Sequence, residues 1–191
     1  SCYGLTIETG TPFERANVAG KLEPAEDGLW RDMYDRMVDT LLQAGIERYE
    51  VSNFARAGHR SAHNQMYWTD RPYLALGPSA HGYAPDGRRW SNVRDVARYL
   101  EALDPTAEVE RPTPRQRAVD LIVSALRSVQ GVDLRHLAAV TKHRLAGPTV
   151  AALVRGGHLT LARERITLTE SAFPLADGVA GQLVRALEPT A

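Results

Sequence analysis

Apolar and polar residues alternate at the start of the chain, where Tyr3, Leu5 and Ile7 are separated by small or polar residues. A period of two is typical of a β-strand, so the pattern predicts a strand over residues 1–8. A terminal strand needs neighbours for its backbone hydrogen bonds, and the first residue is not Met. We therefore expect either the C-terminal part of a longer protein or a complete protein whose first strand pairs internally.

The strongest helical pattern covers residues 29–42, after a predicted loop over residues 11–28. Pairs of apolar residues recur about every four positions, with charged residues between them, which predicts an amphipathic helix. Gly45 is a typical residue just beyond a helix C-terminus. A short strand predicted over residues 49–52 completes a strand–helix–strand order, which favours a βαβ unit with parallel strands.

Residues 55–92 show no regular period, because glycines and prolines interrupt them. The segment is nevertheless rich in tyrosine, tryptophan and histidine. A long loop of this composition is either functional or a covering loop whose rings pack on a neighbouring edge. A short helix follows within residues 93–103, and residues 104–112 read as an acidic linker with a proline.

Beyond residue 112 the pattern predicts three helices, a hairpin and a last helix. The first helix begins at Thr113 and Pro114, a pair that suits a helix N-terminus. The second follows Asp133 and the third begins at Pro148. The strands and the last helix are predicted over residues 158–161, 166–169 and 175–187. This order is typical of a winged-helix module.

Composition and charge narrow the class of protein. Of 191 residues, 43% are apolar and 24% are charged, as in globular proteins. Residues 1–110 hold 12 Lys or Arg against 17 Asp or Glu, whereas residues 111–191 hold 11 against 6, which suggests two parts with different surfaces. The balanced total excludes a uniformly basic nucleic-acid coat. Cys2 is the single cysteine, so this chain alone cannot supply a disulfide framework or an all-cysteine iron–sulfur site. No apolar run reaches the ~18–20 residues of a membrane span, and we expect a cytoplasmic setting.

Three segments in this order resemble a known family: residues 49–56, residues 63–68 and residues 76–83. They are similar to the C-terminal half of the radical SAM proteins related to oxygen-independent coproporphyrinogen III oxidase. The pattern His-Asn-x-x-Tyr-Trp at residues 63–68 resembles the heme chaperone branch rather than the oxidases. Ala75 and Ser79 stand where family members commonly have glycine, which leaves the tightness of the local turn open.

The resemblance implies a fold class and a division of the chain. The expected fold is α/β, with the C-terminal elements of a partial TIM-like radical SAM barrel followed by an α+β winged-helix-like domain. The expected parts are residues 1–58 with the late βαβ units, residues 59–110 as a connecting region rich in His, Gly and aromatic residues, and residues 111–191 as the C-terminal domain.

The resemblance also implies cofactors and partners. Family members bind S-adenosylmethionine on a [4Fe–4S] cluster held by three cysteines of an N-terminal barrel half, and this sequence lacks those cysteines. We expect a missing N-terminal barrel half, heme and acceptor hemoproteins as partners, and no catalysis by this chain alone. Thr6 is the candidate contact to S-adenosylmethionine.

Heme binding requires an axial ligand and a flat apolar surface, and residues 63–68 contain both. His63 is the first candidate for the iron ligand, since neutral imidazole is a usual one. Tyr67 and Trp68 are candidates to stack on the macrocycle, and Asn64 to hydrogen-bond the imidazole. His81 is a second heme-binding candidate, while His59 lies in the same loop but outside the motif.

Two other functions compete with a heme chaperone. A true porphyrinogen oxidase is disfavoured by the residue 63–68 pattern. A nucleic-acid-binding module is suggested by the winged-helix order and the basic residues 111–191. Against it, the third helix has Arg155 as its one basic residue, whereas a helix that reads a DNA groove normally carries several polar or basic side chains.

Overall fold

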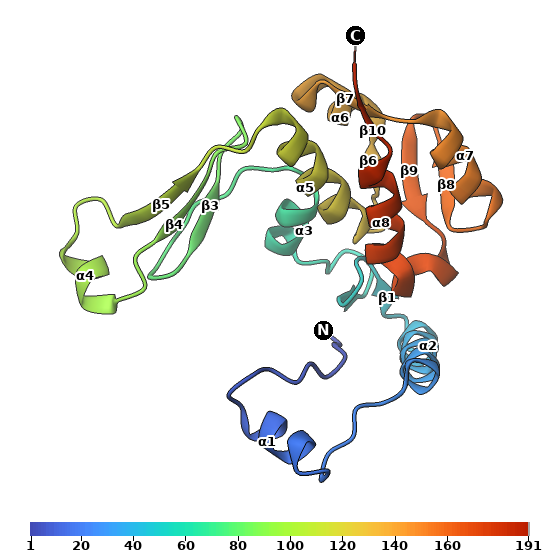
Figure 1. Ribbon diagram of the computed structural model, residues 1–191, viewed down its shortest axis with the longest axis horizontal. Helices are drawn as coiled ribbons and strands as arrows, with labels where there is room; N and C mark the ends of the chain where they lie inside the picture. The colour runs from blue at the N-terminus through green and yellow to red at the C-terminus, as the bar shows by residue number, and fades with distance from the viewer. Residues whose placement is uncertain (191) are drawn as a thin grey trace. The chain divides into compact units, whose positions relative to one another are not determined.

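The computed structural model describes residues 1–190, and these form two compact units (Figure 1). The first unit is residues 1–60, and the second begins at residue 61. Helices and strands are interspersed along the chain, so it is of the α/β class. Residues 1–190 contain no closed barrel. The three-part division expected from the sequence stays a prediction.

The first unit contains two helices and a small hairpin. Helix α1 is Pro12–Val18 and helix α2 is Asp27–Gln43. Strands β1 (Glu47–Arg48) and β2 (Phe54–Ala55) pair antiparallel. The loop predicted over residues 11–28 was wrong at α1, because Thr11 caps a helix there by accepting a hydrogen bond from the Glu14 backbone N–H at 3.2 Å.

The strand predicted over residues 1–8 and the parallel βαβ unit were wrong. Residues 1–8 form no strand, and one backbone bond, from Cys2 N–H to the Ser52 carbonyl at 2.8 Å, links them to the segment between β1 and β2. Alternation of apolar residues describes the faces of a strand, whereas a strand also needs a ladder of partners. Within the first unit that ladder is missing, so the segment stays extended without becoming part of a sheet.

The helix predicted over residues 29–42 is confirmed as α2, and Gly45 follows it with φ of 71°. Its apolar stripe is largely uncovered in the first unit: Trp30 and Met33 are 36% and 50% exposed, and Leu42 is 57% exposed. Tyr49 and Glu50 are the buried residues among residues 1–60. The first unit therefore has very little interior.

The second unit begins with a helix and a three-stranded antiparallel sheet. Helix α3 is Ala62–Trp68, and the sheet order is β3 (His81–Tyr83), β4 (Arg89–Asn92), β5 (Thr106–Glu110). Helix α4, Val96–Glu101, connects β4 to β5 at the end of the sheet remote from helix α5, Pro114–Leu126 (Figure 1).

The predicted long loop over residues 55–92 and linker over residues 104–112 were therefore wrong. Strands of three to five residues, interrupted by glycine and proline, are too short to show a period in the sequence. Their stability comes from pairing with one another across the sheet rather than from local propensity.

The rest of the second unit is a bundle of helices with two small sheets. Its helices are α5 (Pro114–Leu126), α6 (Leu134–Thr141), α7 (Gly147–Arg155), the 3₁₀ helix η1 (Glu170–Leu175) and α8 (Ala176–Arg185). Its strands are β6 (Val132–Asp133), β7 (His143–Leu145), β8 (Leu159–Ala162), β9 (Arg165–Leu168) and β10 (Leu187–Pro189). One antiparallel sheet has the order β6-β9-β8, and β10 pairs with β7.

The local signals predicted from the sequence are confirmed here. Thr113 and Gln116 form a capping box at the start of α5. The Asp133 carboxylate accepts hydrogen bonds from the backbone N–H groups of Arg135 and His136, each at 3.0 Å, and so caps α6. The charged turn of the hairpin has left-handed φ values at Arg163 and Glu164, as a two-residue hairpin turn requires. The finer assignment to the winged-helix class stays a prediction.

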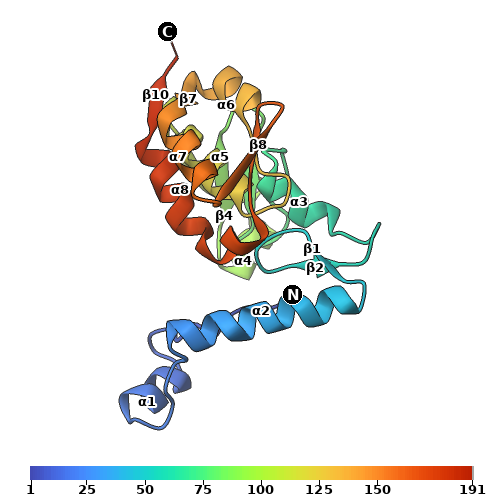
Figure 2. The same cartoon turned by 90° about the vertical axis from the view of Figure 1, so that its right-hand side faces the viewer.

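The core of the second unit lies between α5, α6, α8 and the β6-β9-β8 sheet (Figure 2). Its largest fully buried apolar side chains are Ile122, Leu126, Leu137, Leu159, Ile166, Phe173 and Leu183. These side chains come from α5, α6, η1, α8 and both strands of the β8-β9 hairpin. Helix α3 contacts α5, so this core supports α3. Among the helices of residues 1–190, none combines the length and the apolar character that crossing a membrane requires.

Candidate functional site

Helix α3 positions the residues of the His-Asn-x-x-Tyr-Trp motif. Ser61 caps it, since its hydroxyl accepts a hydrogen bond from the Asn64 backbone N–H at 3.2 Å. Residues four apart lie on one face of a helix, so His63 is beside Tyr67, and Asn64 shares the adjoining face with Trp68. The sequence motif is therefore a helical pattern with two faces.

His63 and Tyr67 are in direct contact. The Tyr67 hydroxyl lies 2.7 Å from Nε2 of His63, and the two rings meet edge to face with centroids 5.1 Å apart. Both side chains are exposed, Tyr67 to 41%. Tyr67 thus occupies Nε2 of the imidazole, and a hydrogen bond from Asn64 to the ring stays a prediction. An accessible, oriented imidazole suits a ligand that approaches from solvent.

Three tyrosine rings follow one another from His63 within the second unit. Tyr67 meets Tyr73 edge to face at 4.6 Å, and Tyr73 stacks on Tyr83 at 5.9 Å with an interplanar angle of 28°. Backbone hydrogen bonds of 3.0 and 2.9 Å join Tyr73 and Tyr83 in both directions. We call Tyr67, Tyr73 and Tyr83 the tyrosine row. The row lines a hollow of about 100 Å³ together with Met66, Asp70, Arg89, Asp120, Leu121 and Ser124.

His81 lies on the same strand face as the end of the tyrosine row. It is two residues from Tyr83 on β3, and residues two apart in a strand share a face. His81 is exposed and pairs with Ser91 of β4. It lines a hollow of about 300 Å³ with Arg89, Trp90, Ser91, Glu108 and Glu110. His63 and His81 thus lie at opposite ends of the row.

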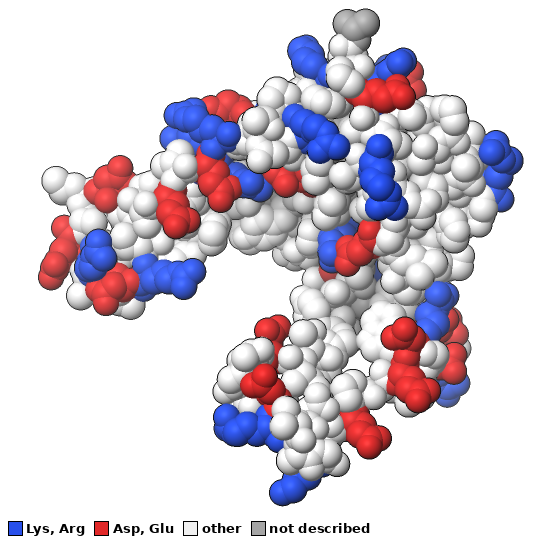
Figure 3. Space-filling model, in the orientation of Figure 1, with Lys and Arg blue, Asp and Glu red and all other residues white. Residues whose placement is uncertain are grey.

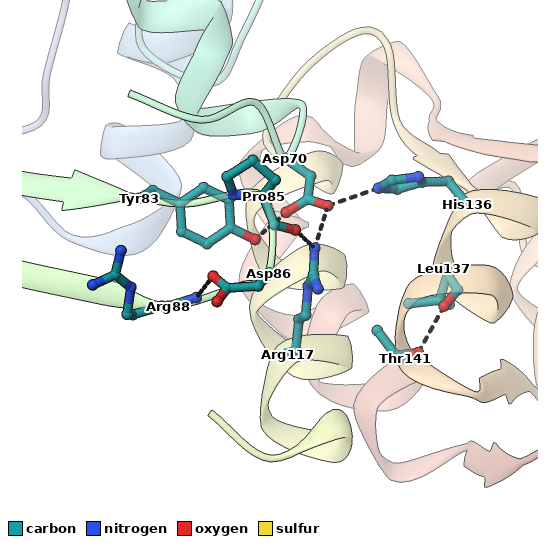
Figure 4. Close-up of polar contacts among 9 residues, drawn as sticks. All are labelled: Asp70, Tyr83, Pro85, Asp86, Arg88, Arg117, His136, Leu137 and Thr141. Carbon is teal, nitrogen blue, oxygen red and sulfur yellow. Dashed lines mark hydrogen bonds and ion pairs between the residues drawn. The ribbon is translucent and has the colours of Figure 1, made fainter. Parts of the chain in front are cut away.

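Asp70 anchors the tyrosine row to the helical bundle (Figure 4). Its carboxylate accepts hydrogen bonds from the Tyr83 hydroxyl and from Arg117 Nη2 at 3.2 Å, and it lies 2.7 Å from His136 Nε2. The side chains of Asp70 and Arg117 are 4% and 13% exposed. These contacts join the turn after α3 to β3, α5 and α6, so Asp70 holds the site on its rigid support.

Burial and the Asp70 carboxylate raise the pKa of the phenol at the end of the row. Burial raises the pKa of Tyr83 far above its usual value, and the hydrogen bond to Asp70 raises it further. Burial also raises the pKa of Tyr73, with Tyr67 adding to that shift. The raised pKa values keep both phenols neutral further into the alkaline range than an ordinary tyrosine, and Tyr83 stays a donor to Asp70 there.

A charged cluster closes the hollow on the side of the sheet. Arg89 makes ion pairs with Glu110 at 2.7 Å and with Asp120 at 2.9 Å. Burial raises the pKa of Asp120, and Glu110 raises it too, while Arg89 opposes them. The Arg89 guanidinium therefore lies beside the tyrosine row, and the carboxylates of Glu110 and Asp120 largely compensate its positive charge.

Trp68 lines a different cavity from Tyr67. It lines a space of about 260 Å³ between α5 and α6, together with residues that include Gln130, His136 and Leu137. Its indole N–H is buried and has no hydrogen-bond partner among the described residues. The structure therefore separates Trp68 from the imidazole with which the sequence motif groups it.

Thr6 is in the first unit and is exposed in the extended segment 1–8. A hollow of about 390 Å³ runs along that segment and α2, and the residues lining it include Leu5 and Ile7 but not Thr6. A contact of Thr6 with S-adenosylmethionine stays a prediction.

The residues present do not fit an iron–sulfur cluster. Cys2 is the single cysteine, and residues 1–190 contain no group of three or more His, Cys, Asp or Glu side chains arranged to hold a metal ion.

The surface of α7 favours packing rather than reading of a nucleic-acid groove. Its exposed positions are Gly147, Pro148, Ala151, Ala152, Val154 and Arg155. One guanidinium among aliphatic groups offers few donors to base edges. On the face drawn in Figure 3, basic and acidic side chains are interspersed over the second unit rather than gathered by sign.

Comparison with known proteins identifies relatives over nearly the whole chain. No family model matches. The chain is 31% identical over 188 residues to a heme chaperone HemW from Mycobacterium tuberculosis, covering 96% of this chain and 47% of that protein. It is 33% identical over 148 residues to a heme chaperone HemW from Synechocystis, covering 74% of this chain and 36% of the relative.

A mitochondrial radical S-adenosyl methionine domain-containing protein 1 from Danio rerio is 32% identical over 150 residues, covering 71% of this chain and 33% of that protein. The solved structure of coproporphyrinogen III oxidase HemN from Escherichia coli, a radical SAM enzyme, matches 87% of this chain and 44% of its own with a TM-score of 0.61 at 14% identity, which shows a shared fold. The chain thus spans about half or less of the length of these relatives.

Proposed function

The chain belongs to the HemW-like branch of the radical SAM proteins related to oxygen-independent coproporphyrinogen III oxidase, and from this premise we propose that it binds heme through His63 and presents it to acceptor proteins. Heme is the cargo in this proposal. The proposed setting is the cytoplasm, in keeping with a single cysteine.

The contact between His63 and the tyrosine row supports this proposal best. An imidazole nitrogen ligates heme iron, and tyrosine rings offer flat apolar surface to a porphyrin. Here an exposed imidazole stands one helical turn from an exposed tyrosine, and two further rings continue behind it. An open site suits a protein that must pass its cargo on, because the acceptor can approach the bound macrocycle.

His81 and Arg89 extend the proposal to the sheet. Both line one hollow on the face of β3 and β4 that also carries Tyr83. His81 is the proposed second contact to heme, whereas Arg89 is already paired with Glu110 and Asp120 and serves in this proposal to hold the lining of the hollow together. Asn64 and Trp68 of the same motif stay candidate heme contacts in this proposal, and Trp68 would act from the cavity that it lines between α5 and α6.

We predict that His63→Ala weakens binding of ferric heme by about tenfold or more, equivalent to about 1.4 kcal/mol of binding free energy. The reason is loss of the axial nitrogen while the tyrosine row remains. The measurement is titration of hemin into the 191-residue chain, followed by the Soret absorbance, with circular dichroism to verify folding.

His59→Ala is the matched control, since His59 is an exposed histidine outside the site. It should leave both affinity and spectrum unchanged. Equal affinities and identical Soret bands for the unmodified chain and His63→Ala would overturn the assignment of His63. His81→Ala should weaken heme binding less than His63→Ala does. The opposite order would identify His81 on β3 as the iron ligand.

A further inference from the structure

The bond between Tyr67 and His63 occupies the nitrogen that heme iron would use. The hydroxyl is 2.7 Å from Nε2, the ring nitrogen farther from the backbone, and the two residues lie one turn apart on α3. A nitrogen that ligates iron donates its lone pair to the metal. The same lone pair accepts the hydrogen bond when the phenol donates, so Nε2 cannot serve both partners at once.

Imidazole nitrogen is a better acceptor than a phenol oxygen, so Tyr67 is the natural donor in this pair. The proton of the neutral imidazole is then on Nδ1, and Nε2 faces the phenol. Iron binding at Nε2 breaks one hydrogen bond and forms one Fe–N bond, and the Tyr67 proton stays on its oxygen. No oxidant or reductant is needed for this exchange.

Tyr67 is held so that it stays beside the imidazole. Its ring packs edge to face on Tyr73, which stacks on Tyr83, and Tyr83 donates to the buried carboxylate of Asp70. Backbone bonds between Tyr73 and Tyr83 fix the last two rings further. The exposed His63 side chain is therefore the freer partner, and its rotation away from Tyr67 uncovers Nε2.

We propose that the Tyr67 hydroxyl competes with heme iron for Nε2 of His63 and thereby sets how readily the chain releases heme. This inference rests on the proposed function of His63. A hydroxyl that recaptures the imidazole favours the heme-free state, which lowers the affinity and speeds transfer to an acceptor. A carrier needs this, since a ligand bound too tightly is not passed on.

The test is Tyr67→Phe, which keeps the ring and removes the hydroxyl. We expect hemin to bind about three- to tenfold more tightly, the range set by loss of one competing hydrogen bond. Transfer of heme to an apo-globin in stopped-flow absorbance should slow by a similar factor. The Soret maximum should stay where it is in the unmodified chain, because the axial ligand remains His63.

Two further variants make the result specific. In the His63→Ala background, Tyr67→Phe should have no effect, because no imidazole is left to compete for. Tyr3→Phe removes an exposed hydroxyl outside the site and should change nothing. Circular dichroism verifies that each variant is folded.

The possible results separate this inference from the proposed function. If His63→Ala weakens heme binding but Tyr67→Phe leaves heme binding unchanged or weakens it, His63 remains the ligand. The proposed competition between the Tyr67 hydroxyl and the iron is then wrong. A shifted Soret band in Tyr67→Phe would instead identify the phenol oxygen as an iron ligand and would also overturn it. If His63→Ala has no effect on heme binding, the proposed function of His63 fails first.

Discussion

Replacing Asp70 by alanine should lower the free energy of unfolding by about 3–5 kcal/mol, as loss of one partner from a buried ion pair does. The substitution leaves the Arg117 guanidinium, which is 13% exposed, without its carboxylate, and it removes the acceptor of the Tyr83 hydroxyl. Urea denaturation followed by circular dichroism measures the loss. Because Asp70 also anchors the tyrosine row, the folded fraction should bind heme less well than the unmodified chain.

Glu188→Ala is the control for this prediction. Its ion pair with Arg144 is exposed on both sides, 49% and 66%, so removing it should cost less than about 1 kcal/mol. Adding Arg117→Met to Asp70→Ala should recover part of the loss, since the orphaned charge is removed too. Equal losses for Asp70→Ala and Glu188→Ala would show that the buried position of Asp70 does not matter to stability.

Replacing Gly131 by alanine should destabilise the second unit by about 2–5 kcal/mol. Gly131 follows α5 with φ of 62°, a conformation that costs other residues about 1–2 kcal/mol. An added Cβ would also lie 2.0 Å from the backbone oxygen of Ile166 in β9, and overpacking of this kind typically costs about 1–3 kcal/mol. The midpoint of thermal unfolding, measured by calorimetry, should fall accordingly.

Gly178→Ala supplies the opposite case in the same unit. Gly178 lies in the exposed first part of α8, with no atom within 4 Å of its would-be Cβ. Alanine there should stabilise by up to about 1 kcal/mol through helix propensity. A loss at Gly178 as large as that at Gly131 would contradict the role given to the close approach of β9.

Helices with strong local signals were predictable from the sequence, whereas short strands were not. The capping box at Thr113 and the apolar stripe of α2 depend only on residues close together in the sequence, so both helices were located correctly. Strand β3 has three residues, too few to show a period in the sequence. Its stability depends on pairing with β4, which a local pattern does not reveal. The segment 1–8 shows the reverse error, since a clear alternation was present but the ladder was not.

The candidate site was predictable in its motif but not in its geometry. The pattern at residues 63–68 drew attention to His63 and Tyr67, which the structure places in contact. The position of Trp68 at another cavity became visible only with the helical geometry. Asp70 gave no signal in the sequence, because a lone aspartate has many possible roles. Its importance comes from Arg117 and His136, which are 47 and 66 residues away in the chain.

The scarcity of interior residues in the first unit has a consequence for its backbone amides. Tyr49 and Glu50 are buried among residues 1–60, whereas α5 and α8 each bury four residues in a shared core. Local opening requires little free energy where few contacts must be broken. In deuterated solvent, the amide protons of α2 should therefore be replaced well before those of α5, although α2 is the longer helix.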